Sequence, residues 1–136
     1  MVLVDTSVLI DFLKGAENTK TELFKMVLKQ KIPYGIASYT YQETLQGARD
    51  EQEYSQLNTY LSTQTIYFLP ENIETYKKAA SIFFELRRQG VTIRSTIDIL
   101  ITLIAIENKL FLLHNDKDFD VISDKVSELR VLSKLN

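Results

Sequence analysis

The chain begins with a short apolar run that ends at three polar residues. Residues 2–4 are Val, Leu and Val, and they lead directly into Asp5, Thr6 and Ser7. A wholly apolar run of this length is typical of a strand buried on both faces of a parallel sheet. Asp, Thr and Ser favour the start of a helix, so the pattern predicts a strand followed at once by a helix. Asp5 would then lie at the carboxyl end of a central strand, the edge at which open α/β sheets bind ligands.

The alternation of apolar runs and amphipathic segments continues along the chain. Further strands are expected at residues 34–37, 66–69, 110–113 and 129–132, and further helices after Gly15 as far as Pro33 and at 38–48, 54–61, 73–90 and 96–107. Strands separated by helices predict an α/β sandwich around a central, mainly parallel sheet. We expect residues 1–136 to form a single domain, because the chain is long enough for one core and has no linker or internal repeat.

Details of two helices follow from the same patterns. In the helix before Pro33, we expect Leu23, Met26 and Val27 to form the buried stripe, broadened by Leu28. The helix that begins near residue 73 should stop at Gly90, since glycine suits the position just after a helix.

Four acidic residues follow predicted strands or lie early in predicted helices, and each has a purely structural explanation. Asp5 suits a helix N-cap, and Asp116 suits a turn. Glu43 lies three residues after Thr40 and matches a capping box. Asp98 lies in the first turn of a predicted helix, where a carboxylate is favoured by the helix dipole.

The four acids together indicate more than four separate caps and turns. The carboxyl ends of parallel strands share one edge of the sheet, so these carboxylates are expected to converge there. They would repel one another unless protons or a cation neutralised them. Oxygen ligands favour Mg²⁺ or Mn²⁺ over zinc. Because such an ion activates water and stabilises charge on a phosphate, the pattern predicts phosphodiester hydrolysis.

Composition excludes several other classes of protein. The chain has no cysteine, which excludes disulfides and thiolate chemistry, and its single histidine, His114, excludes a ribonuclease that uses two histidines. With 16 basic and 18 acidic side chains it is not a basic DNA-binding protein. No apolar run approaches the roughly 18 residues of a membrane span, and no basic segment precedes the first apolar run. A cytoplasmic protein without a membrane segment is therefore expected.

The motifs resemble those of a known family. The segment Asp-Thr-Ser-Val-Leu-Ile-Asp-Phe-Leu-Lys-Gly, residues 5–15, resembles the opening of PIN-domain proteins, especially VapC-type toxins of bacterial toxin–antitoxin pairs. The similarity continues at Glu43 and is strongest again at residues 98–101 and 112–119. It covers nearly the whole chain.

The resemblance implies a PIN-like three-layer α/β/α sandwich and a Mg²⁺-dependent endoribonuclease in which Mn²⁺ can substitute. It also implies an RNA substrate, a homodimer and a cognate antitoxin that blocks the acidic site. By position, Asp5, Glu43, Asp98 and Asp116 correspond to the acidic quartet, which is both catalytic and metal-binding. Asp5 and Asp98 are the expected direct ligands.

Three further residues lie near the quartet in the sequence. Thr6 is a candidate for holding the Asp5 loop or a water of the metal. Asp118 is either an auxiliary ligand or a solvated turn acid. His114 departs from the family pattern, in which a small hydroxyl residue is common, and is expected to be an ordinary residue at the end of a strand.

Two other functions stay open at this point. The chain could be an inactive PIN-type binding module that only carries the acids. It could instead be a different metal-dependent α/β phosphohydrolase, such as a phosphatase.

Overall fold

The computed structural model describes residues 1–135, and in that range five strands form one parallel sheet with the order β3-β2-β1-β4-β5. The strands are β1 (Val2–Val4), β2 (Tyr34–Ala37), β3 (Ile66–Tyr67), β4 (Phe111–Leu113) and β5 (Arg130–Val131). The helices are α1 (Thr6–Leu13), α2 (Thr19–Lys29), α3 (Ser38–Gln46), α4 (Glu51–Leu61), α5 (Ile73–Arg88), α6 (Thr96–Glu107) and α7 (Lys117–Lys125). The predicted α/β class with a parallel sheet is confirmed.

The first strand is the centre of the sheet. All three residues of β1 are buried, and the strand pairs with β2 on one side and β4 on the other. Val4 is in register with Leu113, so the two strands end together. This common end places the residues that follow each strand at the same edge of the sheet.

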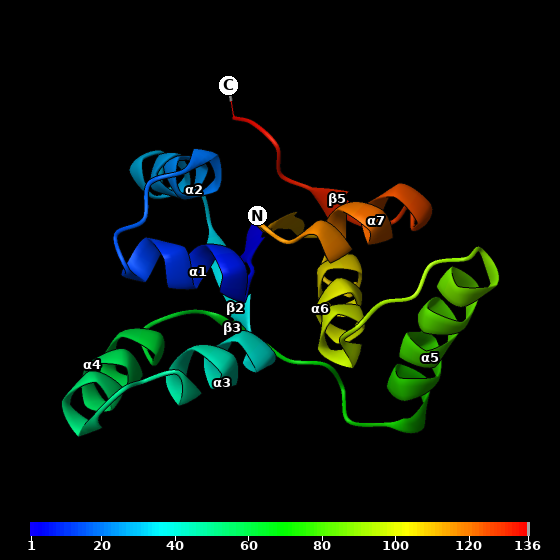
Figure 1. Cartoon of the computed structure of the whole chain (residues 1–136), viewed down its shortest axis with the longest axis horizontal. Helices are drawn as coiled ribbons and strands as arrows, with labels where there is room; N and C mark the ends of the chain where they lie inside the picture. Colours follow the sequence, from blue (N-terminus) through cyan, green and yellow to red (C-terminus); the bar gives the residue numbers. More distant parts are fainter. Residues whose placement is uncertain (136) are drawn as a thin grey trace.

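Alternate residues of the central strands face two different cores. Leu3 and Leu112 belong to a cluster that includes residues of α5, α6 and α7, whereas Val2, Val4 and Leu113 belong to a cluster with residues of α1, α2 and α4. Figure 1 shows these two groups of helices on opposite sides of the sheet. The three-layer α/β/α arrangement therefore follows from the alternation of side chains along each strand.

The predicted strands are in the right places, but three of them are shorter than expected. The strand expected at 66–69 is only Ile66–Tyr67, and the side chain of Phe68 is 68% exposed. The last strand is Arg130–Val131, and β4 begins at Phe111. β3 and β5 are edge strands with a partner on one side only.

The helix ends agree well with the sequence, but one buried stripe was wrong. Gly90 has φ of 83° and follows α5 as expected. In α2, however, Met26 and Leu28 are exposed, and the buried residues are Thr21, Leu23, Phe24 and Val27. Phe24 makes edge-on contacts with Phe12 and Tyr34, with ring centroids 4.8 and 5.3 Å apart, and these contacts set which face of α2 is buried.

Helix α7 was not predicted, because the segment after Asp116 was interpreted only as a turn. Phe119 and Ile122 are three residues apart and both fully buried, which is the spacing of a helix face. Asp116 is the N-cap, and its side chain accepts a hydrogen bond from the backbone N–H of Asp118 at 2.9 Å. Among residues 1–135, no helix has the length and apolar character needed to cross a membrane.

Glycine is required at position 35 by close packing. A Cβ atom there would lie 2.7 Å from the carbonyl oxygen of Thr65 and 2.6 Å from the Tyr67 ring. We expect Gly35→Ala to destabilise the protein by about 1–3 kcal/mol, the usual cost of overpacking, measured by urea unfolding. Gly47→Ala is the control, because a Cβ at residue 47 comes no closer than 3.4 Å to its surroundings. Equal stability of the two variants would contradict the packing argument.

Candidate active site

Asp5 is both a helix cap and a buried carboxylate. It is the N-cap of α1, and its Oδ2 accepts hydrogen bonds from the Ser7 backbone N–H at 3.1 Å and from Ser7 Oγ at 2.6 Å. The side chain is 5% exposed, and burial raises its pKa above the usual range. The bonds from Ser7 and the Thr6 amide act in the opposite direction, while the nearby Glu43 raises the pKa further. The N-cap interpretation is confirmed, and it fixes the carboxylate at the carboxyl end of β1.

Glu43 is not part of a capping box, so that interpretation was wrong. Helix α3 begins at Ser38, its N-cap is Ala37, and Thr40 is buried inside the helix. The Oε1 atom of Glu43 instead accepts a hydrogen bond from Thr6 Oγ1 at 2.8 Å. Thr6 Oγ1 also lies 3.0 Å from Thr40 Oγ1. Because a hydroxyl has one proton, Thr40 donates to Thr6 while Thr6 donates to Glu43.

Asp98 has the environment that defines the site. It lies in the first turn of α6, and its pKa is raised to about 7. Burial is the largest cause, and the charges of Asp116, Asp5, Asp118 and Glu43 follow in that order. In Figure 1 helices α3 and α6 both begin near the lower end of the sheet. The structure therefore brings the four predicted acids, and Asp118, into one electrostatic neighbourhood.

The last two acids are on the turn between β4 and α7. Asp116 is the α7 N-cap, which agrees with its interpretation as a turn residue. Asp118 Oδ2 lies 3.7 Å from Arg94 Nε, and its side chain is 19% exposed while that of Arg94 is 83% exposed. Asp118 is thus the member of the group that has a basic partner, and it is less solvated than a typical turn acid.

Ser7 is a residue of this site that the sequence reasoning missed. Its Oγ donates to Asp5 Oδ2 and accepts a hydrogen bond from the Asn115 backbone N–H at 2.9 Å. One hydroxyl therefore connects the loop after β1 to the loop after β4. The available signal was its position two residues after Asp5, where a short hydroxyl side chain can bond back to the carboxylate.

The donor set fits a divalent cation in its chemistry. Within residues 1–135, none of Asp5, Glu43, Asp98 and Asp116 is in an ion pair with lysine or arginine. In the same range no three carboxylate or histidine side chains are already arranged as ligands of a metal ion. The two findings agree, because charge repulsion acts over longer distances than coordination bonds and keeps unneutralised carboxylates apart. All four offer only oxygen, the donor that Mg²⁺ and Mn²⁺ prefer.

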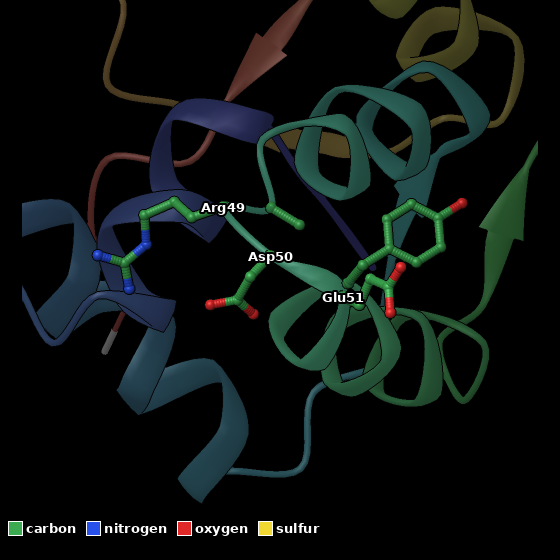
Figure 2. A pocket seen from close by; sticks show the side chains of 5 residues that line it. Arg49, Asp50 and Glu51 are labelled. Atoms are coloured by element: carbon green, nitrogen blue, oxygen red, sulfur yellow. The ribbon is translucent and has the colours of Figure 1, made fainter.

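Two concave regions lie outside the acidic group. Figure 2 shows the pocket at the connection between α3 and α4, lined by Ala48, Arg49, Asp50, Glu51 and Tyr54. Arg49 is paired there with Glu53 at 2.9 Å. A larger groove between α1, α3 and α4 is lined by residues including Ile10, Leu13, Leu57 and Tyr60. Neither region contains an acid of the predicted quartet.

Comparison with known proteins identifies the family. The sequence profile of the PIN domain matches residues 2–125, so the chain belongs to the PIN domain family. The VapC ribonuclease of Mycobacterium bovis is 27% identical over 134 residues, which are 98% of this chain and 98% of that protein. Ribonuclease VapC11 of Mycobacterium tuberculosis has the same identity and coverage, 27% and 98%.

Several solved VapBC structures have the same fold. The superposition on VapBC2 from Rickettsia felis, solved with a DNA fragment from its promoter, covers 97% of this chain and 98% of the matched chain. The identity is 20% and the TM-score is 0.74. DNA-bound VapBC from Salmonella typhimurium covers 97% and 98%, with 19% identity and a TM-score of 0.72. VapBC-1 from nontypeable Haemophilus influenzae covers 97% of each chain, with 24% identity and a TM-score of 0.68. At these identities the likeness establishes the PIN-like fold.

Removing one charge from the acidic group should stabilise the metal-free protein. At pH 8 Asp98 is ionised and is repelled by its neighbours, so we expect Asp98→Asn to raise the Tm in EDTA. The side chain is half-buried, and solvent screening limits the gain to about 1 kcal/mol, or roughly 3–5 °C for a domain of this size. Asp124→Asn is the control, because the Asp124 side chain is 77% exposed and lies 4.0 Å from Lys125. A Tm of Asp98→Asn at or below that of the control would contradict the charge repulsion.

Proposed function

We propose that the chain is a Mg²⁺-dependent endoribonuclease of the VapC type, the toxin of a toxin–antitoxin pair, and that Mn²⁺ substitutes for Mg²⁺. The observation that carries the proposal is the convergence of carboxylates from three other elements, the start of α1, helix α3 and the start of α7, on Asp98 in α6, whose pKa their charges raise together with burial. Four acids that repel one another in this way weaken the fold unless they serve to bind a cation.

Asp5 and Asp98 are the proposed direct ligands, and Glu43 and Asp116 complete the site. When bound, the ion would supply Lewis acidity toward the phosphate and lower the pKa of water. The chain itself fixes the carboxylates: Ser7 orients Asp5, and Thr6 orients Glu43. Glu43 Oε1 is occupied by Thr6, so its other oxygen is the atom that would accept a proton from the attacking water. Asp118, beside Arg94, is a proposed outer residue.

The comparisons support each partner in this proposal. The curated relatives are named as ribonucleases, and the alignment covers nearly their whole length, which supports an RNA substrate. Solved structures with the same fold include a toxin–antitoxin complex from Klebsiella pneumoniae and VapBC-5 of Mycobacterium tuberculosis, a member of a family of toxin–antitoxin systems, which supports a cognate antitoxin as partner. The family match over residues 2–125 supports a single PIN-like domain. We further propose that the protein acts in the cytoplasm, where its RNA substrate would be.

The alternative that best fits the same fold is a catalytically inactive PIN-type binding module. All four acids are present, and no basic residue opposes the rise in the pKa of Asp5 and of Asp98. A module without metal chemistry would gain from replacing such acids by neutral residues, which favours the nuclease. A phosphatase is the second alternative, and its substrate would be a small phosphate monoester rather than an RNA chain.

The decisive test is metal-dependent cleavage of RNA. We expect purified wild-type protein to cut RNA internally with Mg²⁺ or Mn²⁺ and to lose this activity in EDTA. Asp98→Asn should reduce the rate by at least about 100-fold, because losing even an outer partner of a metal ligand costs about 10–100-fold. Asp5→Asn should behave alike, and Asp124→Asn, with its exposed side chain, should retain activity.

Other outcomes would select one of the alternatives. Failure to cut total RNA, combined with no Mn²⁺ binding in calorimetry, would favour the binding module and contradict the nuclease. Release of phosphate from a monoester such as p-nitrophenyl phosphate, without internal RNA cuts, would favour the phosphatase. Full activity of Asp98→Asn would show that the proposed quartet is wrong.

The expected homodimer has a suitable surface on α5. Thr75, Ala79 and Leu86 on one side of this helix are buried. The opposite side presents Ile73, Tyr76, Ala80 and Phe84. The exposed fractions of Ile73, Tyr76 and Phe84 are 78%, 48% and 50%. An apolar stripe on both sides of a helix is unusual for a surface helix. Figure 1 shows α5 at the outer side of the molecule, where a second copy could reach it.

Charge favours a second copy in antiparallel orientation on this stripe. Glu74 lies in the first turn of α5, while Arg87 and Arg88 lie in the last. Two antiparallel α5 helices with Ala80 at the centre would place Tyr76 opposite Phe84 and Glu74 near the basic end of the other copy. The small Ala80 would allow a close approach of the two helices.

We therefore expect Phe84→Lys to convert the protein from dimer to monomer in sedimentation equilibrium. A lysine at residue 84 would place a charge against Tyr76 of the other copy, so the apolar contact that Phe84 makes there would be lost. Met26→Lys is the matched control, since Met26 is also an exposed apolar residue, 37%, but on α2. A monomeric wild-type protein, or a dimer that survives Phe84→Lys, would contradict this surface.

A further inference from the structure

His114 is buried at the end of β4 and is bonded to the backbone of the acidic loop. Its side chain is 1% exposed, and its ring centroid lies 5.2 Å from that of Phe119. The backbone N–H of Asp116 donates to His114 Nδ1 at 3.1 Å. A residue expected to be an ordinary strand end therefore contacts the backbone of a proposed metal ligand.

This hydrogen bond determines which ring nitrogen carries the proton. A nitrogen that accepts a hydrogen bond has no proton of its own, so Nδ1 is unprotonated and Nε2 carries the N–H. Nε2 is buried and has no hydrogen-bond partner within residues 1–135. The nearest acidic oxygen is Asp120 Oδ1 at 3.6 Å, slightly beyond hydrogen-bonding distance. The Asp120 side chain is 73% exposed, so it can shift to meet Nε2–H without disturbing the core.

The loop between β4 and α7 is thus held from two sides. Ser7 Oγ accepts the N–H of Asn115, and His114 accepts the N–H of Asp116. The Asp116 side chain in turn caps α7 at Asp118. Ser7 ties this loop to Asp5, whereas His114 ties it to the core beside Phe119. Without His114, the backbone that carries the Asp116 carboxylate would keep only one of its two anchors.

We propose that His114 is a positioning residue for Asp116: as the Nε2–H tautomer it fixes the Asp116 backbone through Nδ1 and bonds Asp120 through Nε2. A small hydroxyl side chain at this position could accept the hydrogen bond from the Asp116 backbone, but it could not also reach Asp120 as the histidine does. The inference rests on the proposed function for its catalytic consequence, but its structural content can be measured without RNA.

The tautomer can be read directly, because His114 is the only histidine in the chain. Long-range ¹H–¹⁵N correlation spectra of ¹⁵N-labelled protein, without metal, should show one imidazole with a protonated Nε2 and an unprotonated Nδ1. Asp120→Ala should leave this tautomer but speed the solvent exchange of the Nε2 proton. A protonated Nδ1, or an Nε2 proton unaffected by Asp120→Ala, would overturn the proposal.

Two substitutions separate positioning from simple filling of the core. His114→Asn keeps an acceptor oxygen in place of Nδ1, whereas His114→Leu fills the space with no acceptor. We expect His114→Leu to abolish the exchange protection of the Asp116 amide and to weaken Mn²⁺ binding in calorimetry by about 10–100-fold, the usual effect of losing a residue that orients a metal ligand. Asn should retain both properties. Equal behaviour of the two variants would show a packing role only.

The outcomes also distinguish this proposal from the nuclease proposal. If RNA is not cut but the tautomer and the Asp116 protection are as expected, the positioning role stands and the nuclease fails. If RNA is cut while the spectrum shows a protonated Nδ1, the nuclease stands and the positioning role fails. Should His114→Leu not fold, the wild-type spectrum and Asp120→Ala still decide the question.

Discussion

Repulsion among carboxylates at the carboxyl edge of the sheet is the constraint on which the rest of the site depends. A parallel sheet ends its strands together, so any acids that follow those strands are brought near one another. Neutral hydroxyl groups limit the motion of these carboxylates. Ser7 donates a hydrogen bond to Asp5, and Thr6, which is itself bonded to Thr40, donates one to Glu43. Neutral donors orient a carboxylate without cancelling its charge. The charge therefore stays on the carboxylates, where the proposed cation would neutralise it, at a cost to the stability of the protein alone.

The parts of this architecture that could be predicted are those in which local pattern and tertiary packing agree. β1 is apolar on both faces because it is central, and the limits of α6 were predicted as found. The positions of the four acids at one edge followed from the topology alone. Parallel strands and their connecting helices leave little choice of where Asp5 and Asp98 can lie.

The parts that could not be predicted depend on contacts between distant segments. The capping-box pattern at Thr40 and Glu43 is locally sound, but the N-cap of the helix is Ala37, three residues before Thr40, and Thr6 binds the glutamate. The buried face of α2 is set by the rings of Phe12 and Tyr34, not by the helix's own pattern. Ser7 accepts a hydrogen bond from the backbone N–H of Asn115, which is far away in the sequence. His114 accepts one from the backbone N–H of Asp116, two residues further along the turn. No local rule predicts such partners.

The pairing of β1 with β4 also has a consequence for the order in which the chain is made. Val4 finds its partner Leu113 only after most of the protein has left the ribosome, and β4 in turn pairs with β5 at Arg130 and Val131. Contacts so distant in sequence form late in folding. A nascent chain would therefore carry its first carboxylate long before it acquires the last, and the proposed acidic site would stay incomplete until synthesis is nearly finished.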